Sequence, residues 1–209
     1  VPSGTFANVL VTVEALFGLL LTAMSTGLIF AKFATPTAQL IFSSVALIRP
    51  LEGQRVLTFR IGNRRPNQII EAQVRLTLLR RTVIDGEELY RFFDLPLVRD
   101  VSPVFSMTWS VFHVIDEESP LAELATAEDF AAADATLMVT FRGIDGSIAQ
   151  AVHARYAYEP TELLCNRRFV DVVSTNPKNG LRVFELARFH ETEPLVASPS
   201  ESAEPAGQR

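Results

Sequence analysis

Few side chains in this sequence have the types and spacing that chemistry requires. The run Asp116 to Glu118 could form an acid and base pair or hold a cation, but such a run is far more often a solvated surface segment. The histidines His113, His153 and His190 are far apart in the sequence, and Cys165 is the only cysteine, without a C-x-x-C partner. We therefore expect no metal site and no nucleophilic catalysis, and we expect Cys165 to behave as a small buried hydrophobe.

Composition excludes further classes of function. The sequence contains no G-x-S-x-G elbow, P-loop, G-x-G-x-x-G or H-E-x-x-H motif. Its 24 acidic and 19 basic residues give a net charge of −5, which offers no electrostatic footprint for nucleic acid. These observations argue against an enzyme and against a nucleic-acid-binding protein.

The apolar residues are concentrated near the start of the chain. Residues 6–33 carry only two charges, Glu14 and Lys32. About 25 helical residues span roughly 37 Å, enough to cross a hydrocarbon core of about 30 Å. A signal peptide would need a basic leader and a cleavage site, and a buried soluble helix is seldom so long. We predict a transmembrane segment over residues 1–36, with the basic residues that follow it placing the C-terminal part in the cytoplasm.

The predicted helix carries one stripe of regular spacing. Thr22, Thr26 and Phe30 recur every four residues and share a face, while Gly18 and Gly27 are available for bending or close packing. One interpretation is a helix that lines an aqueous path, with two hydroxyls and an apolar constriction at Phe30. The other is an interface between helices built on the small residues around Gly27. Periodicity alone does not decide between them.

After residue 36 the pattern changes to alternation of polar and apolar residues, which predicts strands with one buried face. We predict an antiparallel β-sandwich of immunoglobulin-like type over residues 37–195, with turns at Glu52-Gly53, Asp85-Gly86, Asp145-Gly146 and Asn179-Gly180. The predicted strands are 40–48, 55–61, 71–78, 89–97, 105–114, 136–141, 149–158, 168–173 and 182–187.

Two segments of the second half are not predicted as strands. Ser119-Pro120 predicts the start of a short helix that continues to about Ala133. Residues 196–209 are rich in Pro, Ser, Ala and Glu and lack apolar periodicity, which predicts a disordered tail.

Several segments together resemble the inward rectifier potassium channels, in particular the bacterial branch often called KirBac. The most specific are the end of the apolar segment, residues 25–36, and the run His113 to Leu121, followed by Gly62 to Arg65 and Ile70 to Arg75. Further matching segments are 42–44, 94–95, 149–155, 169–172 and 188–191.

The resemblance implies a homotetramer in the inner membrane that conducts K⁺ passively, with no covalent cofactor. It implies that Phe30 forms the gate, that Thr22, Thr26 and Glu71 line the pore, and that Gly18 or Gly27 is the hinge. In strongly rectifying relatives the position of Thr22 is an acid, so this hydroxyl argues against strong rectification. Residues 143–152 match the loop that narrows the cytoplasmic pore. We also assign the chain to the broader class of voltage-gated channels.

The resemblance also bears on lipids. Lys32, Arg65 and Arg75 match basic positions that bind or couple to phosphoinositide headgroups in eukaryotic relatives, and electrostatics allows an anionic lipid near Lys32. Residues 35, 38 and 39 are Thr, Ala and Gln where those relatives are basic. Binding of anionic, phosphoinositide-like lipid is therefore expected, but activation by it is not.

The resemblance begins just after the selectivity filter of the family, so potassium selectivity is an implication of the resemblance alone. The rival interpretation is a single-pass, membrane-anchored β-sandwich that acts as a binding or adaptor module. It accounts for the helix and the strands but not for the Thr22, Thr26 and Phe30 stripe.

Overall fold

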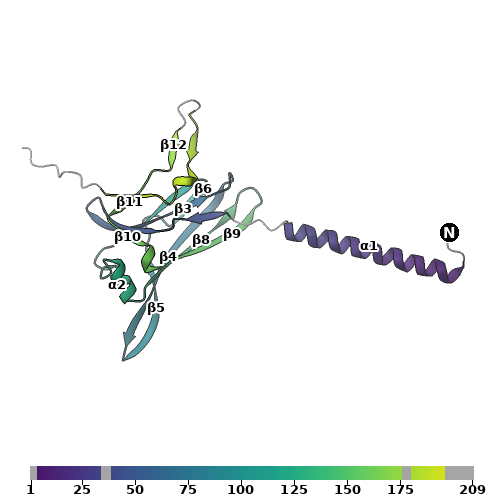
Figure 1. The fold of residues 1–209 in the computed structure, drawn as a ribbon, viewed down its shortest axis with the longest axis horizontal. Helices are drawn as coiled ribbons and strands as arrows, with labels where there is room; N and C mark the ends of the chain where they lie inside the picture. The colour runs from purple at the N-terminus through teal and green to yellow at the C-terminus, as the bar shows by residue number, and fades with distance from the viewer. Residues whose placement is uncertain (1–3, 34–38, 176–179, 196–209) are drawn as a thin grey trace, which may run out of the picture. The chain divides into compact units, whose positions relative to one another are not determined.

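The structure, a computed structural model, describes residues 4–33, 39–175 and 180–195 and divides the chain into two compact units, Val1–Thr37 and Ala38–Arg209 (Figure 1). The first unit contains α1 (Thr5–Phe33). Among the described residues, α1 is the one helix that is long and apolar enough to cross a membrane, and its apolar window is not buried inside the chain. The predicted helix break at residues 34–36 and the predicted tail at 196–209 lie outside the described residues.

The second unit consists mainly of strands. Their bounds are β1 (Leu40–Phe42), β2 (Ala46–Leu51), β3 (Gln54–Asn63), β4 (Ile69–Ile84), β5 (Glu87–Leu95), β6 (Val101–Phe105), β7 (Thr108–Val114), β8 (Thr136–Asp145), β9 (Gln150–Tyr158), β10 (Leu163–Cys165), β11 (Arg167–Phe169), β12 (Val173–Thr175), β13 (Arg182–Phe184) and β14 (Thr192–Pro194). The helical segments are α2 (Ala127–Ala132) and the 3₁₀ turns η1 (Pro160–Glu162) and η2 (Leu186–Arg188).

Two five-stranded sheets form the body of this unit. The first sheet has the order β1-β3-β2-β10, with β7 paired to β3, and the second has the order β5-β4-β8-β9, with β6 paired to β4. Two small antiparallel pairs, β11-β14 and β12-β13, complete it. Most pairs are antiparallel as predicted, but β10 pairs with β2 in parallel.

The two sheets pack on one another through aromatic side chains. Phe59 of the first sheet and Tyr158 of the second have ring centroids 5.8 Å apart, and Trp109 and Phe105 repeat the contact at 6.2 Å. The Tyr158 hydroxyl lies 3.0 Å from Ser43 Oγ, which satisfies both polar atoms inside the core. Burial raises the pKa of Tyr158 far above its ordinary value. The predicted β-sandwich is therefore confirmed.

Two of the predicted turns are tight hairpins. Glu52 and Gly53 have φ of 51° and 77°, and Asp85 and Gly86 have φ of 52° and 86°. Positive φ at both central residues is the type I′ geometry, whose twist matches that of the flanking strands. These turns fix the β2-β3 and β4-β5 registers.

The predicted strand 40–48 is divided in two. Its halves, β1 and β2, lie along the same edge of β3, but the register of pairing with β3 shifts between Phe42↔Ile61 and Leu47↔Thr58. The interruption is at Ser43, whose backbone N–H donates to the carbonyl of Arg60 while its Oγ accepts from the Arg60 N–H. This local hydrogen bonding competes with the regular ladder, and alternation of residue types does not reveal it.

The short helix begins later than predicted. Residues 117–123 form turns, and α2 covers only Ala127–Ala132. A capping box sets its start, because Thr126 Oγ1 accepts from the Asp129 N–H and the Asp129 carboxylate accepts from the Thr126 N–H. Ser119 instead accepts the Leu121 N–H in a turn, so the Ser-Pro signal marks a turn and not a helix.

Candidate functional site

The α1 stripe is exposed along its length within the described chain. Phe30, the predicted gate, is 74% exposed. Thr22 Oγ1 donates to the carbonyl of Gly18 and Thr26 Oγ1 to the carbonyl of Thr22, both at 2.8 Å. Both threonine hydroxyls thus donate their hydrogen bonds to carbonyls of the same helix, so only their oxygen lone pairs are free to face another group.

The predicted hinge glycines have open space beside them in the described part of the chain. There, a Cβ on Gly18 or on Gly27 would meet no atom within 4 Å apart from the neighbouring backbone of α1 itself. Gly18 also accepts the Thr22 hydroxyl, and this type of back-bonding slightly destabilises and bends helices. The local chemistry at Gly18 is therefore suited to bending.

Glu71 lies at an irregularity of β4. The pairing of β4 with β8 shifts between Ile70 and Gln73, and Glu71 has a φ of 52°. This is a β-bulge, which redirects the side chains beside it. The exposed Glu71 side chain lines the same depression as Gln73 and Arg142.

Arg65 and Asp145 form the ion pair of a small polar network. Arg65 Nη1 lies 3.7 Å from the Asp145 carboxylate, which also accepts from Asn67 Nδ2 at 2.7 Å and from the Ser147 N–H at 2.9 Å. The Ser147 N–H, then the Asn67 amide, lower the pKa of Asp145. Residues 143–152 begin within β8, so this network connects the turn that follows β8 with the segment before β4.

Arg65 and Arg75, two of the three predicted lipid-binding residues, lie apart within the second unit. Arg65 pairs with Asp145, whereas Arg75 lies opposite Thr140, five residues earlier in β8. Five strand residues correspond to about 17 Å at about 3.4 Å each. Lys32 belongs to the other unit, in the last turn of α1, where a cation complements the helix dipole.

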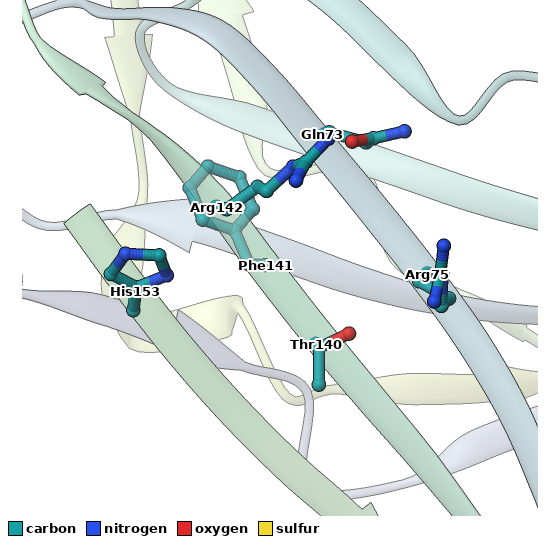
Figure 2. Close-up of a pocket in the computed structure, with 6 residues that line it drawn as sticks. All are labelled: Gln73, Arg75, Thr140, Phe141, Arg142 and His153. Atoms are coloured by element: carbon teal, nitrogen blue, oxygen red, sulfur yellow. The ribbon is translucent and has the colours of Figure 1, made fainter. Parts of the chain in front are cut away.

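Arg75 also belongs to a polar face of the second sheet that was not predicted from the sequence. We call it the outward face of the second sheet, made of Glu71, Gln73 and Arg75 of β4, Thr140 and Arg142 of β8, and His153 and Arg155 of β9. Figure 2 shows Gln73 and Arg75 on one strand, Thr140 and Arg142 on the next and His153 on the third, where they line a pocket. Only the strand register brings them together, although the alternation within each strand was a usable signal.

The remaining candidates are the cysteine, the histidines and the acidic run. In the part of the chain that the structure describes, no three His, Cys, Asp or Glu side chains are grouped to hold a metal ion. Cys165 is half-buried, with Sγ 3.5 Å from the carbonyl oxygen of Ala125, and burial raises the pKa of its thiol. The run Asp116 to Glu118 is exposed.

Comparison with known proteins defines the class of protein to which this chain belongs. Residues 40–209 match the model of the inward rectifier potassium channel C-terminal domain. The chain therefore belongs to the inward rectifier potassium channel family, as its motifs predicted.

Individual relatives agree with this assignment. The chain is 43% identical over 192 residues to the inward rectifier potassium channel Kirbac3.1 of Paramagnetospirillum magnetotacticum, covering 91% of this chain and 64% of that protein. It is 31% identical over 210 residues to the human inward rectifier potassium channel 4, covering 94% of this chain and 45% of that protein. These relatives are channels and not enzymes, and they give no support to the voltage-gated class.

The chain thus spans less than two thirds of the length of these relatives. Among solved structures, the sporulation control protein Spo0M from Bacillus subtilis overlaps 60% of this chain and 50% of its own, with a TM-score of 0.32 and 13% identity.

Proposed function

We propose that this chain is a subunit of a homotetrameric, inward-rectifier-type potassium channel in the inner membrane. The observation that carries the proposal is an exposed apolar helix directly preceding a domain of the inward rectifier family. Such a helix needs lipid or other helices around it, and four copies around one axis in a membrane would have both kinds of neighbour. The sandwich of each subunit then lies in the cytoplasm, as the basic residues after α1 favour.

In this proposal α1 lines the path of K⁺. Four copies of Phe30 form an apolar constriction that closes by dewetting, and Thr22 and Thr26 line the path above it with oxygen lone pairs. Opening requires the helices to bend, for which Gly18 and Gly27 are the candidate hinges. Both glycines have room for a Cβ, so a glycine-to-alanine change would stiffen the helix without a clash against the described residues of the same chain.

The cytoplasmic contributions follow from the second unit. Glu71 supplies a carboxylate to the vestibule, and Lys32, Arg65 and Arg75 are the candidate contacts for anionic, phosphoinositide-like lipid. Arg65 is 41% exposed and already faces the nearly buried Asp145, so a lipid phosphate at this position would compete with that carboxylate. Arg75 and Arg65 would contact separate headgroups because of their separation along the sheet.

The test is ion flux through the natural full-length protein in liposomes. We expect K⁺ efflux that exceeds Na⁺ efflux, and we expect Phe30→Ala to raise the K⁺ flux severalfold by removing the constriction. Phe17→Ala is the matched control, because Phe17 is also exposed on α1 but lies on a different face.

Each part of the proposal has its own contrary result. Protein that forms no K⁺-selective path would contradict the channel and favour a membrane-tethered sandwich. Normal selectivity with a Phe30→Ala flux equal to that of the Phe17→Ala variant would contradict only the gate.

A further inference from the structure

The sequence contains the dipeptide Asp-Gly twice, and the fold places the two copies in different environments. Asp85 and Gly86 form the two-residue turn between β4 and β5, whereas Asp145 is the last residue of β8 and Gly146 follows it. An aspartate that precedes a glycine can isomerise without an enzyme, because glycine has no side chain to hinder attack by its backbone nitrogen on the aspartate carboxyl group. The surroundings of each copy determine whether this reaction can occur.

Both reacting groups are free in the Asp85-Gly86 turn. The two residues are exposed. Within the described residues, the Asp85 carboxylate accepts no hydrogen bond and forms no ion pair, and the Gly86 N–H donates to no acceptor. A Cβ on Gly86 would meet no described atom within 4 Å beyond its two chain neighbours, so this side of the turn is unpacked in the described chain.

Both reacting groups are occupied at Asp145 and Gly146. Asp145 is 3% exposed, and its carboxylate accepts from the Ser147 N–H at 2.9 Å and from Asn67 Nδ2 at 2.7 Å. The Gly146 N–H donates to the carbonyl of Gln68 at 2.8 Å. The bonds to the carboxylate stabilise its ionised form, whereas the reaction needs a neutral carboxyl group whose hydroxyl can leave. Asp145 is therefore protected in the folded chain.

The β4-β5 hairpin can expose the reacting atoms at little cost. The closed type I′ turn does not align them, because attack requires rotation about the bond between Asp85 Cα and its carbonyl carbon. The reaction therefore proceeds from conformations in which the tip of the hairpin has opened. Residues 83–92 are all exposed, and Figure 1 shows the hairpin extending away from the body of the second unit. Segments that bury so little surface open at low free energy.

We propose that Asp85 is a site of spontaneous isoaspartate formation. The Gly86 nitrogen attacks Cγ of the neutral Asp85 carboxyl group, so that an N–Cγ bond forms, the nitrogen loses its proton and the hydroxyl leaves as water. Solvent water then opens the resulting cyclic succinimide. Addition of water at Cγ restores aspartate. Addition at the main-chain carbonyl leaves the chain connected through Cγ, which is isoaspartate, with no net change in mass.

Isoaspartate would change the tip of the hairpin. It adds the β-carbon to the path of the backbone, so the turn no longer matches the twist of the two strands. The pairs nearest the turn, Ile84↔Glu87 and Val83↔Glu88, would lose their register. The Arg81–Glu88 ion pair, at 3.1 Å, lies in the same segment. The modification would therefore loosen the exposed end of the hairpin and leave the two five-stranded sheets in place.

The test is peptide mass spectrometry of the natural full-length protein in detergent after incubation for several weeks, with fragmentation that distinguishes isoaspartate from aspartate. We expect isoaspartate at Asp85 in about tenfold or greater excess over Asp145, because the exposed tip opens at a much lower free energy than the core strand β8. In protein unfolded by denaturant the hydrogen bonds of Asp145 are absent, so the two sites should then react at similar rates.

Two variants of the turn are the matched controls. Asp85→Asn should react faster, because its side chain is neutral at every pH and Asn before Gly suits the type I′ turn. Asp85→Glu should give no comparable product, because the longer side chain would have to close a larger ring, and Glu52 already occupies the equivalent position of the β2-β3 turn. Absence of isoaspartate at Asp85, or equal amounts at Asp85 and Asp145 in folded protein, would overturn the proposal. The measurement reads a covalent change and not flux, so its outcome leaves the channel proposal unaffected.

Discussion

At the scale of single residues, His113 shows how burial fixes a protonation state. Its imidazole is 1% exposed, with Nδ1 2.7 Å from the carbonyl oxygen of Pro96 and Nε2 2.8 Å from Ser119 Oγ. A carbonyl oxygen only accepts, so Nδ1 carries the proton and Nε2 accepts from the Ser119 hydroxyl. Ser119 Oγ in turn accepts the Leu121 N–H, which satisfies every polar atom while the ring is neutral.

This arrangement predicts a stability that depends on pH. Burial lowers the pKa of His113 below its ordinary value, although the Pro96 carbonyl and Asp116 partly oppose it. The unfolded chain therefore binds a proton at pH values where the folded chain does not. The free energy of unfolding consequently falls as the pH drops below about 6.5 towards the pKa of His113 in the folded state. We expect a loss of up to about 1 kcal/mol between pH 7.5 and 5.5, measured by denaturant unfolding.

Two histidine variants make the test specific. His113→Asn should be less stable at every pH but should lose most of the pH dependence. His153→Asn, which changes an exposed histidine, should retain the dependence of the unchanged protein. An unaltered slope in the His113→Asn variant would show that another group titrates.

At the scale of elements, the bulge in β4 depends on a close approach by β8. A Cβ at Gly143 would lie 2.5 Å from Ile69 Cγ2, 3.3 Å from the Ile70 carbonyl oxygen and 3.4 Å from Ala72 Cα. Two of these atoms belong to backbone, which cannot move without disturbing the ladder. The absence of a side chain at Gly143 therefore permits the bulge that carries Glu71.

We predict that Gly143→Ala destabilises the sandwich by about 1–3 kcal/mol in denaturant unfolding, because of overpacking. The shortest clash is with Ile69 Cγ2, so Ile69→Ala should relieve part of it. The double variant should be more stable than the sum of the two single effects predicts, since the residues are in contact. Strict additivity would contradict the clash as the cause.

Elements with strong local signals could be predicted from the sequence, and those that depend on tertiary context could not. Apolar length predicted α1, and two-residue turn signals predicted two hairpins, because these features are encoded within a few residues. The interruption at Ser43 depends on Arg60 and on Tyr158 of another strand, and β10 has only three residues. The same distinction applies to the candidate site. Motifs identified Arg75 and Glu71, whereas Arg142 lies beside them only because of the register of β4 with β8.

At the scale of the whole molecule, the exposed surface of α1 predicts assembly. Phe30, Leu28 and Leu19 are each more than two thirds exposed within one copy. Light scattering of the natural full-length protein in mild detergent, with the detergent contribution subtracted, should give the mass of four copies. A mass of one copy across a tenfold dilution series would contradict the homotetramer and would favour the single-pass tethered module.

The parallel pairing of β2 with β10 also has a consequence for the order in which the chain folds during synthesis. Ala46 pairs with Leu163, so the edge of β2 that faces away from β3 has no partner until nearly the whole sandwich has left the ribosome. Until then Ala46, Leu47 and Ile48, all buried in the finished fold, present an open apolar edge to other nascent chains. Premature termination before Leu163 should therefore yield fragments that associate with one another instead of shortened domains that remain soluble.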